Sequence, residues 1–99
     1  MLRVVFSERS RQQLLELYDF IADASSAESA HRSTSALNKH CRSLAEFPFR
    51  GVSQDHVHPG LRTLVFRGRV TITYSVDADT VTILGIFYAG RDWQGGVEL

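Results

Sequence analysis

Hydrophobic and polar residues follow a strand-like pattern in three successive segments of the C-terminal half of the chain. The pattern predicts strands at Leu61–Arg67, Val70–Val76 and Thr80–Tyr88. The middle segment alternates strictly between apolar and hydroxyl-bearing side chains. The segments are joined by Arg67-Gly68-Arg69 and by Asp77-Ala78-Asp79, which are too short for anything but antiparallel hairpins.

The last of these strands is apolar on both faces. Strict alternation places Val81, Ile83 and Phe87 on one side and Leu84, Ile86 and Tyr88 on the other. A strand of this kind is central in its sheet and covered on both faces. One layer of helices supplies one cover, so we expect the second face to be completed by a partner protein.

The N-terminal half predicts one strand and two helices. Leu2–Phe6 is a short apolar strand, and Ser7 is a suitable N-cap for a helix from about Glu8 to Asp23. Ser25 and Glu28 have the spacing of a capping box before a second helix, roughly Ser26 to Glu46, which Pro48 and Gly51 end. The short connection predicts an antiparallel helical hairpin, and Val52–Gly60 is expected to be a polar loop.

The predicted fold is therefore α+β, in the order β-α-α-β-β-β. We expect a four-stranded antiparallel sheet with the helical hairpin packed on one face. A chain of 99 residues has the size of a single domain, spanning residues 1–99, and we expect the tail from about residue 93 to be flexible.

Composition indicates an ordinary soluble protein. No uninterrupted apolar stretch suggests a signal peptide or a membrane span, and the single cysteine, Cys41, agrees with a reducing compartment. We therefore expect a cytoplasmic protein without membrane contact. The 11 basic and 11 acidic residues balance, and Lys39 is the one lysine among the basic residues.

Four sequence motifs stand in a particular order along the chain. They are Phe47-Pro48-Phe49-Arg50-Gly51, Leu61-Arg62, Ile72-Thr73-Tyr74, and the apolar strand from Thr82 that runs into Gly90-Arg91. Together with the predicted elements, this set resembles the toxins of bacterial type II toxin–antitoxin modules in the RelE/ParE superfamily. The tail Tyr88-Ala89-Gly90-Arg91-Asp92-Trp93 is more similar to the ParE branch.

The ParE resemblance implies a toxin that inhibits DNA gyrase and takes part in plasmid stabilisation. It implies a cognate ParD-like antitoxin that forms a hetero-oligomer with the toxin, and DNA contact only through antitoxin or gyrase; no cofactor is expected. Target binding is assigned to Arg91, Asp92 and Trp93. The predicted antitoxin groove consists of Leu64, Phe66, Leu84, Ile86 and Tyr88, with Arg67 and Arg69 as docking cations.

Two alternatives remain open. A RelE-like, ribosome-dependent endoribonuclease would use Arg62, Tyr88 and Arg91 as catalytic residues. RelE-like nucleases dock on ribosomal RNA through a strongly basic surface that is rich in lysine. The zero net charge of this chain argues against such docking. The second alternative is an inactive relative that still binds an antitoxin.

A metal site is not expected. His56 and His58 point the same way on an extended segment, but two ligands do not make a zinc site, and His40 and Cys41 face different sides of their helix. Cys41 shares an apolar stripe with Leu37 and Leu44, which predicts a packed core thiol.

Overall fold

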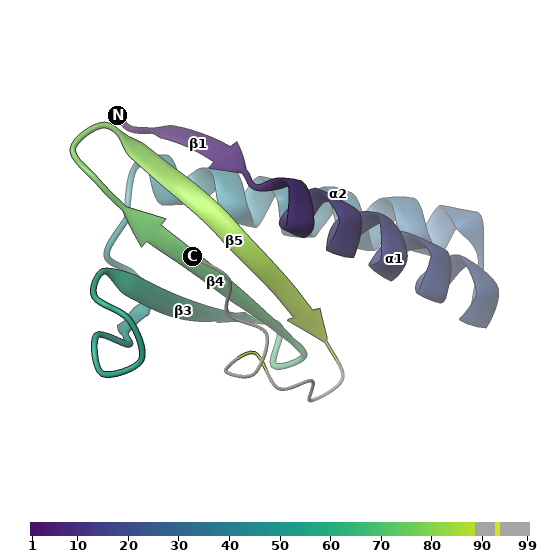
Figure 1. Ribbon diagram of the computed structural model, residues 1–99. Coiled ribbons are helices and arrows are strands. Elements are labelled where there is room, and N and C mark those ends of the chain that lie inside the picture. The colour runs from purple at the N-terminus through teal and green to yellow at the C-terminus, as the bar shows by residue number, and fades with distance from the viewer. Residues whose placement is uncertain (89–92, 94–99) are drawn as a thin grey trace.

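The computed structural model describes residues 1–88 and residue 93, and it confirms the α+β class (Figure 1). Both helices lie on one face of a mixed sheet. In chain order the elements are β1 (Arg3–Phe6), α1 (Glu8–Ala24), α2 (Ala27–Arg42), the 3-10 helix η1 (Ser43–Ala45), β2 (Val52–Ser53), β3 (Leu61–Phe66), β4 (Val70–Val76) and β5 (Thr80–Tyr88).

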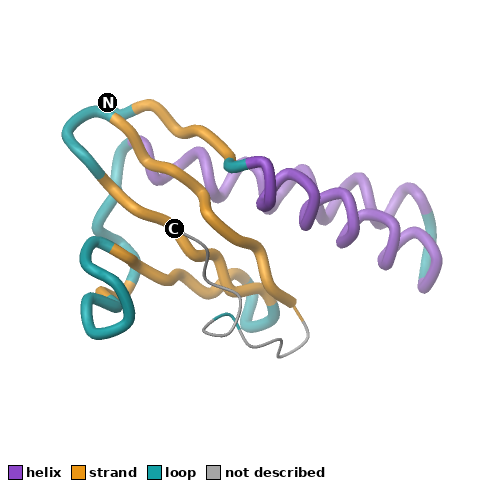
Figure 2. Tube along the Cα trace, in the orientation of Figure 1, coloured by secondary structure: helices purple, strands orange, loops and turns teal. Residues whose placement is uncertain are grey.

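The strands are ordered β1-β5-β4-β3-β2, so the apolar strand β5 lies between two neighbours, as its composition predicted. β3, β4 and β5 form the expected antiparallel meander (Figure 2). β2 lies where the sequence predicted only a loop. It places Val52 opposite Thr63 and Ser53 opposite Arg62, and so adds a two-residue strand to the edge of the sheet.

β1 corrects the expectation of an all-antiparallel, four-stranded sheet. It pairs with β5 in parallel, with Arg3 opposite Thr80. The chain then enters α1 at Ser7, whose backbone N–H donates to the carbonyl of Ile83 at 2.9 Å and whose hydroxyl donates to that of Leu84 at 3.2 Å. These bonds fix the start of α1 beside β5 and thereby the direction of β1, which the hydrophobic pattern does not encode.

A β-bulge in β5 corrects the predicted division of its side chains between two faces. The register against β4 shifts within β5, where Leu84 is an extra residue. Ile83 and Ile86, three positions apart, consequently both belong to the core cluster beneath the helices, and Tyr88 packs against it. The prediction that Leu84, Ile86 and Tyr88 together line the uncovered face is therefore wrong.

The opposite face of the sheet is more polar than expected. Thr71 and Thr73 of β4 alternate with core residues and so point away from the helices, and in the described part of the chain no helix covers this face (Figure 1). Val65 is 58% exposed there. The ring of Phe87 lies against Gly85, where an added Cβ would stand 2.5 Å from the ring.

The helix ends are set by serine caps. The Ser7 hydroxyl accepts a hydrogen bond from the Ser10 N–H, as predicted for α1. The predicted capping box of Ser25 and Glu28 is wrong, because Ser26 caps α2 and accepts from the Ser29 N–H at 3.0 Å, while Ser25 closes α1. In the described residues neither helix is long and apolar enough to cross a membrane.

The core lies between the helices and the sheet. Leu17 from α1 and Leu37 from α2 meet the inward-facing residues of β4 and β5. Cys41 is fully buried in the same cluster, which confirms the prediction of a packed thiol. Burial raises its pKa to about 12, against a small opposing effect of Arg42, so the thiol stays protonated at neutral pH.

Candidate functional site

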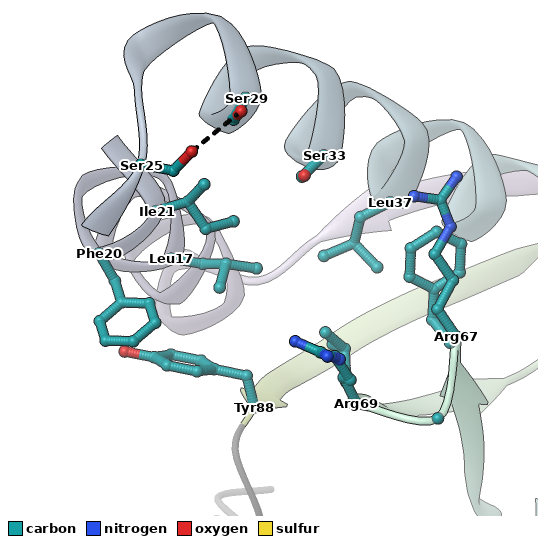
Figure 3. Close-up of a pocket in the computed structure, with 13 residues that line it drawn as sticks. Leu17, Phe20, Ile21, Ser25, Ser29, Ser33, Leu37, Arg67, Arg69 and Tyr88 are labelled. Carbon is teal, nitrogen blue, oxygen red and sulfur yellow. Dashed lines mark hydrogen bonds between the residues drawn. The ribbon is translucent and has the colours of Figure 1, made fainter. Parts of the chain in front are cut away.

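A cleft of about 690 Å³ opens between the outer half of the helical hairpin and the turn that joins β3 to β4 (Figure 3). We call it the hairpin–turn cleft. Its lining comes from three parts of the chain that are distant in sequence: Leu17, Phe20, Ile21 and Ser25 near the end of α1; Ser29, Ser33 and Leu37 of α2; and Phe66, Arg67, Gly68, Arg69, Val70 and Tyr88 of the sheet.

The floor of the cleft is apolar. Leu17 and Leu37 are buried at its base and belong to the core. Phe20 is 52% exposed, and its ring lies 5.2 Å from that of Tyr88 at an angle of 41°, which forms a wall of two tilted rings (Figure 3). A large aromatic side chain left half in solvent at the rim of an apolar hollow is typical of an interaction site.

Small hydroxyl side chains form the rim on the α2 side. Ser29 and Ser33 stand one helical turn apart, and Ser25 lies before them at the hairpin connection. The Ser25 hydroxyl donates to that of Ser29 at 3.2 Å. These side chains are short, so a partner backbone could approach α2 closely along this rim.

Two arginines form the rim on the sheet side. Arg67 and Arg69 extend from the β3–β4 turn toward the helical hairpin (Figure 3). Arg67 lies over the ring of Phe66, with its guanidinium carbon 4.9 Å from the ring centre. In the described part of the chain neither arginine has a carboxylate partner, so this rim is electropositive.

The positive charge extends from the turn toward the end of α2. The His40 ring is tilted at 45° to that of Phe66, with 4.9 Å between ring centres. Its pKa is lowered, first by partial burial and then by Arg50 and Arg67. The neutral form is therefore favoured, and arginines supply the fixed charge near the cleft.

The structure gathers part of the predicted antitoxin groove into this cleft. Phe66, Arg67, Arg69 and Tyr88 line it, whereas Leu64 and Leu84 are half-buried and lie outside its lining. Ile86 is 2% exposed and presents no side-chain surface to a partner. The prediction missed the α1 and α2 residues of the cleft, since helical periodicity alone marks Leu17 and Ile21 as core.

The side chain of Arg62 is bound to the loop that precedes β2. Its guanidinium donates to the carbonyls of Gly51 at 2.8 Å and Phe49 at 3.2 Å, and it lies over the Phe49 ring. Arg62 pairs with Tyr74 of β4, and Tyr88 pairs with Val70 of the same strand. Tyr74 and Val70 are four residues apart on β4, which corresponds to about 13 Å along the strand. Arg62 and Tyr88 therefore do not converge on one scissile phosphate.

The predicted target-binding residues lie mostly beyond what the structure describes. Arg91 and Asp92 are outside the described residues. The tail that was predicted to be flexible is also outside them, apart from Trp93. Trp93 is half-buried. The assignments of Arg91 and Asp92, including Arg91 as a nuclease residue, and of Trp93 stay predictions.

A second exposed apolar patch lies on the loop that follows η1, away from the cleft. Phe47 is 60% exposed and Phe49 is 66% exposed, on either side of Pro48. Arg50 lies over the Phe47 ring at 5.5 Å. Sequence analysis placed these aromatic residues in a turn motif and did not predict their exposure. Two phenylalanines on either side of a proline were the feature that could have indicated an exposed apolar patch.

The histidine and cysteine positions do not gather around a common point. Among residues 1–88 and 93, no three histidine, cysteine or acidic side chains are placed to hold a metal ion. His56 and His58 are exposed in the loop before β3, and Cys41 is in the core.

Comparison with known proteins gives a family match and a similar structure. Residues 4–93 match a family model described as the ParE toxin of the type II toxin–antitoxin system parDE. The chain is similar in structure to a chain of the chromosomal ParDE toxin–antitoxin system from P. aeruginosa, with a TM-score of 0.77 and 20% sequence identity, covering 90% of this chain and 97% of that one. No curated protein matches in sequence.

Proposed function

The chain belongs to the ParE toxin family of type II toxin–antitoxin systems, and we propose that it is a cytoplasmic toxin that inhibits DNA gyrase until a cognate antitoxin neutralises it. The antitoxin is a ParD-like protein that forms a hetero-oligomer with the toxin, and the pair contributes to plasmid stabilisation. DNA is contacted only through gyrase or the antitoxin. The observation that carries the antitoxin part of this proposal is the hairpin–turn cleft.

The cleft has the features that an amphipathic helix requires. Apolar anchors of a bound helix recur every three or four residues and need a hydrophobic floor, which Leu17, Ile21 and Val70 supply. The short serines along α2 permit close approach, and Phe20 and Tyr88 form an aromatic wall. An antitoxin helix seated here would cover apolar surface that the toxin alone leaves in contact with water.

Inhibition by binding, without chemistry, is supported by the environment of the candidate catalytic residues. Arg62 already donates hydrogen bonds to two backbone carbonyls, and Tyr88 contributes to the wall of the cleft. RNA cleavage needs a base, an acid and a cation around one phosphate. Arg62 and Tyr88 are too far apart along the sheet to serve one phosphate together, which favours the gyrase proposal over a RelE-like nuclease.

A supercoiling assay tests this function. Purified toxin is added to gyrase with relaxed plasmid and ATP, with and without an equimolar amount of the antitoxin whose co-expression restores growth. We expect loss of supercoiling and accumulation of cleaved plasmid, both reversed by the antitoxin. Messenger RNA in a parallel translation reaction should stay intact. Unimpaired gyrase together with degraded messenger RNA would contradict the proposal and identify a nuclease.

A further inference from the structure

We propose that Arg67 and Arg69 form a carboxylate-binding pair at the mouth of the hairpin–turn cleft, which recognises acidic residues on the antitoxin helix. This inference rests on the proposed function, because it assigns a chemistry to the partner of the same cleft. It states which kind of antitoxin the toxin accepts: an amphipathic helix with aspartate or glutamate beside its apolar ridge.

The backbone of the turn provides the first argument. The Arg69 N–H donates to the Phe66 carbonyl at 3.1 Å, and Arg67 and Gly68 have φ values of 54° and 68°. Both central residues of this β-turn have positive φ, a combination for which asparagine and glycine are preferred. Arg67 is the one residue other than glycine with positive φ in the described chain. An arginine at a strained position is a reason to look for a function.

The side-chain environment provides the second argument. The Phe66 ring supports the Arg67 guanidinium at 4.9 Å and restricts its motion, so less conformational entropy is lost when a ligand binds. Neither Arg67 nor Arg69 has an ion pair with another described residue. The planar guanidinium matches a carboxylate in a two-point hydrogen bond.

The surroundings distinguish a protein ligand from nucleic acid. A nucleic acid would require cations along a phosphate backbone, yet among the described residues the charged side chains that line this cleft are two, Arg67 and Arg69. The remaining lining consists of apolar residues, a glycine and serines. Two cations beside an apolar floor suit an amphipathic helix that carries carboxylates next to its apolar residues.

Charge exchange between the two proteins tests the proposal. The partner is the antitoxin whose co-expression restores growth, and its dissociation constant is measured by calorimetry for wild-type toxin and for R67E/R69E. We expect at least a tenfold weaker complex. Replacing one acidic residue of the antitoxin by arginine should weaken binding to the wild type and restore binding to R67E/R69E. The wild-type complex should weaken more with added salt than the R67E/R69E complex.

Two further variants keep the test decisive. R32E removes an exposed arginine of α2 outside the cleft lining and should bind as the wild type does. R67N/R69Q keeps a turn-compatible residue and should bind at least fivefold more weakly without loss of melting temperature. Binding of R67E/R69E within twofold of wild type, or displacement of the antitoxin by a short DNA duplex, would overturn the proposal. If wild-type toxin binds no antitoxin at all, the proposed function itself fails.

Discussion

The hydroxyl of Tyr74 and the backbone nitrogen of Gly51 lie 2.9 Å apart and are joined by a buried hydrogen bond. The same hydroxyl donates to the Pro48 carbonyl at 2.8 Å, while Arg62 holds the carbonyls of Phe49 and Gly51. The Phe-Pro-x-x-Gly, Leu-Arg and Ile-x-Tyr motifs thus meet at one loop. The residues that most clearly indicate the family therefore secure the fold, and they lie apart from the cleft.

Removing the Tyr74 hydroxyl should destabilise the protein. Tyr74→Phe leaves the buried N–H of Gly51 without its acceptor, which costs about 1–3 kcal/mol. Urea denaturation of the toxin measures the loss. Tyr18→Phe on α1 is the matched control, since the structure shows no hydrogen bond to that hydroxyl among the described residues. Its expected change is below about 0.5 kcal/mol. Equal effects of the two changes would contradict the assigned role of Tyr74.

A side chain at Gly51 should be poorly tolerated. An added Cβ would lie 2.5 Å from the Thr63 carbonyl oxygen and 2.7 Å from the Tyr74 hydroxyl. Gly51→Ala is expected to cost about 1–3 kcal/mol, because backbone must move to relieve the first contact. Gly60→Asn is the comparison, at a position with a φ of 84° and open space around it. Asparagine tolerates this conformation, so the unfolding free energy should change little.

Replacing Arg67 should stabilise the toxin while weakening its complex with the antitoxin. Arg67→Asn gives the turn a residue that suits positive φ, and we expect a gain of about 0.5–1 kcal/mol in the free toxin. Arg69→Asn should bring no such gain, because Arg69 is not among the residues with positive φ. Thermal unfolding of both variants decides between them. A loss of stability in R67N would show that the arginine is not strained.

The exposed ring of Phe20 should contribute to antitoxin binding. Phe20→Ala removes half of the aromatic wall, and we expect the dissociation constant to rise at least tenfold, or about 1.4 kcal/mol. Phe49→Ala removes a ring of comparable exposure outside the cleft and should leave the constant within twofold. If the Phe49 change is the more damaging one, the antitoxin binds at the loop after η1 and the cleft assignment is wrong.

The Cys41 thiol should resist modification in the folded protein. Its pKa, raised to about 12 by burial, leaves almost no thiolate at pH 8, and the side chain is inaccessible. We expect labelling by a disulfide reagent to be at least 100-fold faster in urea. Above pH 9 the thiol ionises only in the unfolded chain, so this group favours unfolding as pH rises toward 12. Rapid labelling under native conditions would contradict a packed core thiol.

Hydrophobic periodicity predicted the helical hairpin and the three-stranded meander, because both depend on local patterns and short connections. Three features depend on information that a local pattern lacks. The direction of β1 is fixed by contacts of Ser7 with the distant strand β5. The cap of α2 is Ser26, although Ser25 is chemically equivalent. The bulge at Leu84 breaks the alternation on which the assignment of faces relied.

The candidate site was predicted only in part. Phe66 and Tyr88 of the predicted groove line the cleft, together with the predicted docking cations Arg67 and Arg69. The part of the cleft that α1 and α2 line was not predicted. The sequence shows which residues of a helix are apolar, but it does not show which part of the helical hairpin extends beyond the sheet. Phe20 lies beside the apolar stripe of α1 in sequence, and only the tertiary structure places it against Tyr88.

A crystal structure of the toxin bound to its antitoxin tests the central claim most directly. We expect an antitoxin helix in the hairpin–turn cleft, with apolar side chains against Leu17, Ile21 and Val70 and a carboxylate on Arg67 or Arg69. An antitoxin that covers only the threonine-bearing face of the sheet, and leaves the cleft filled with water, would contradict it.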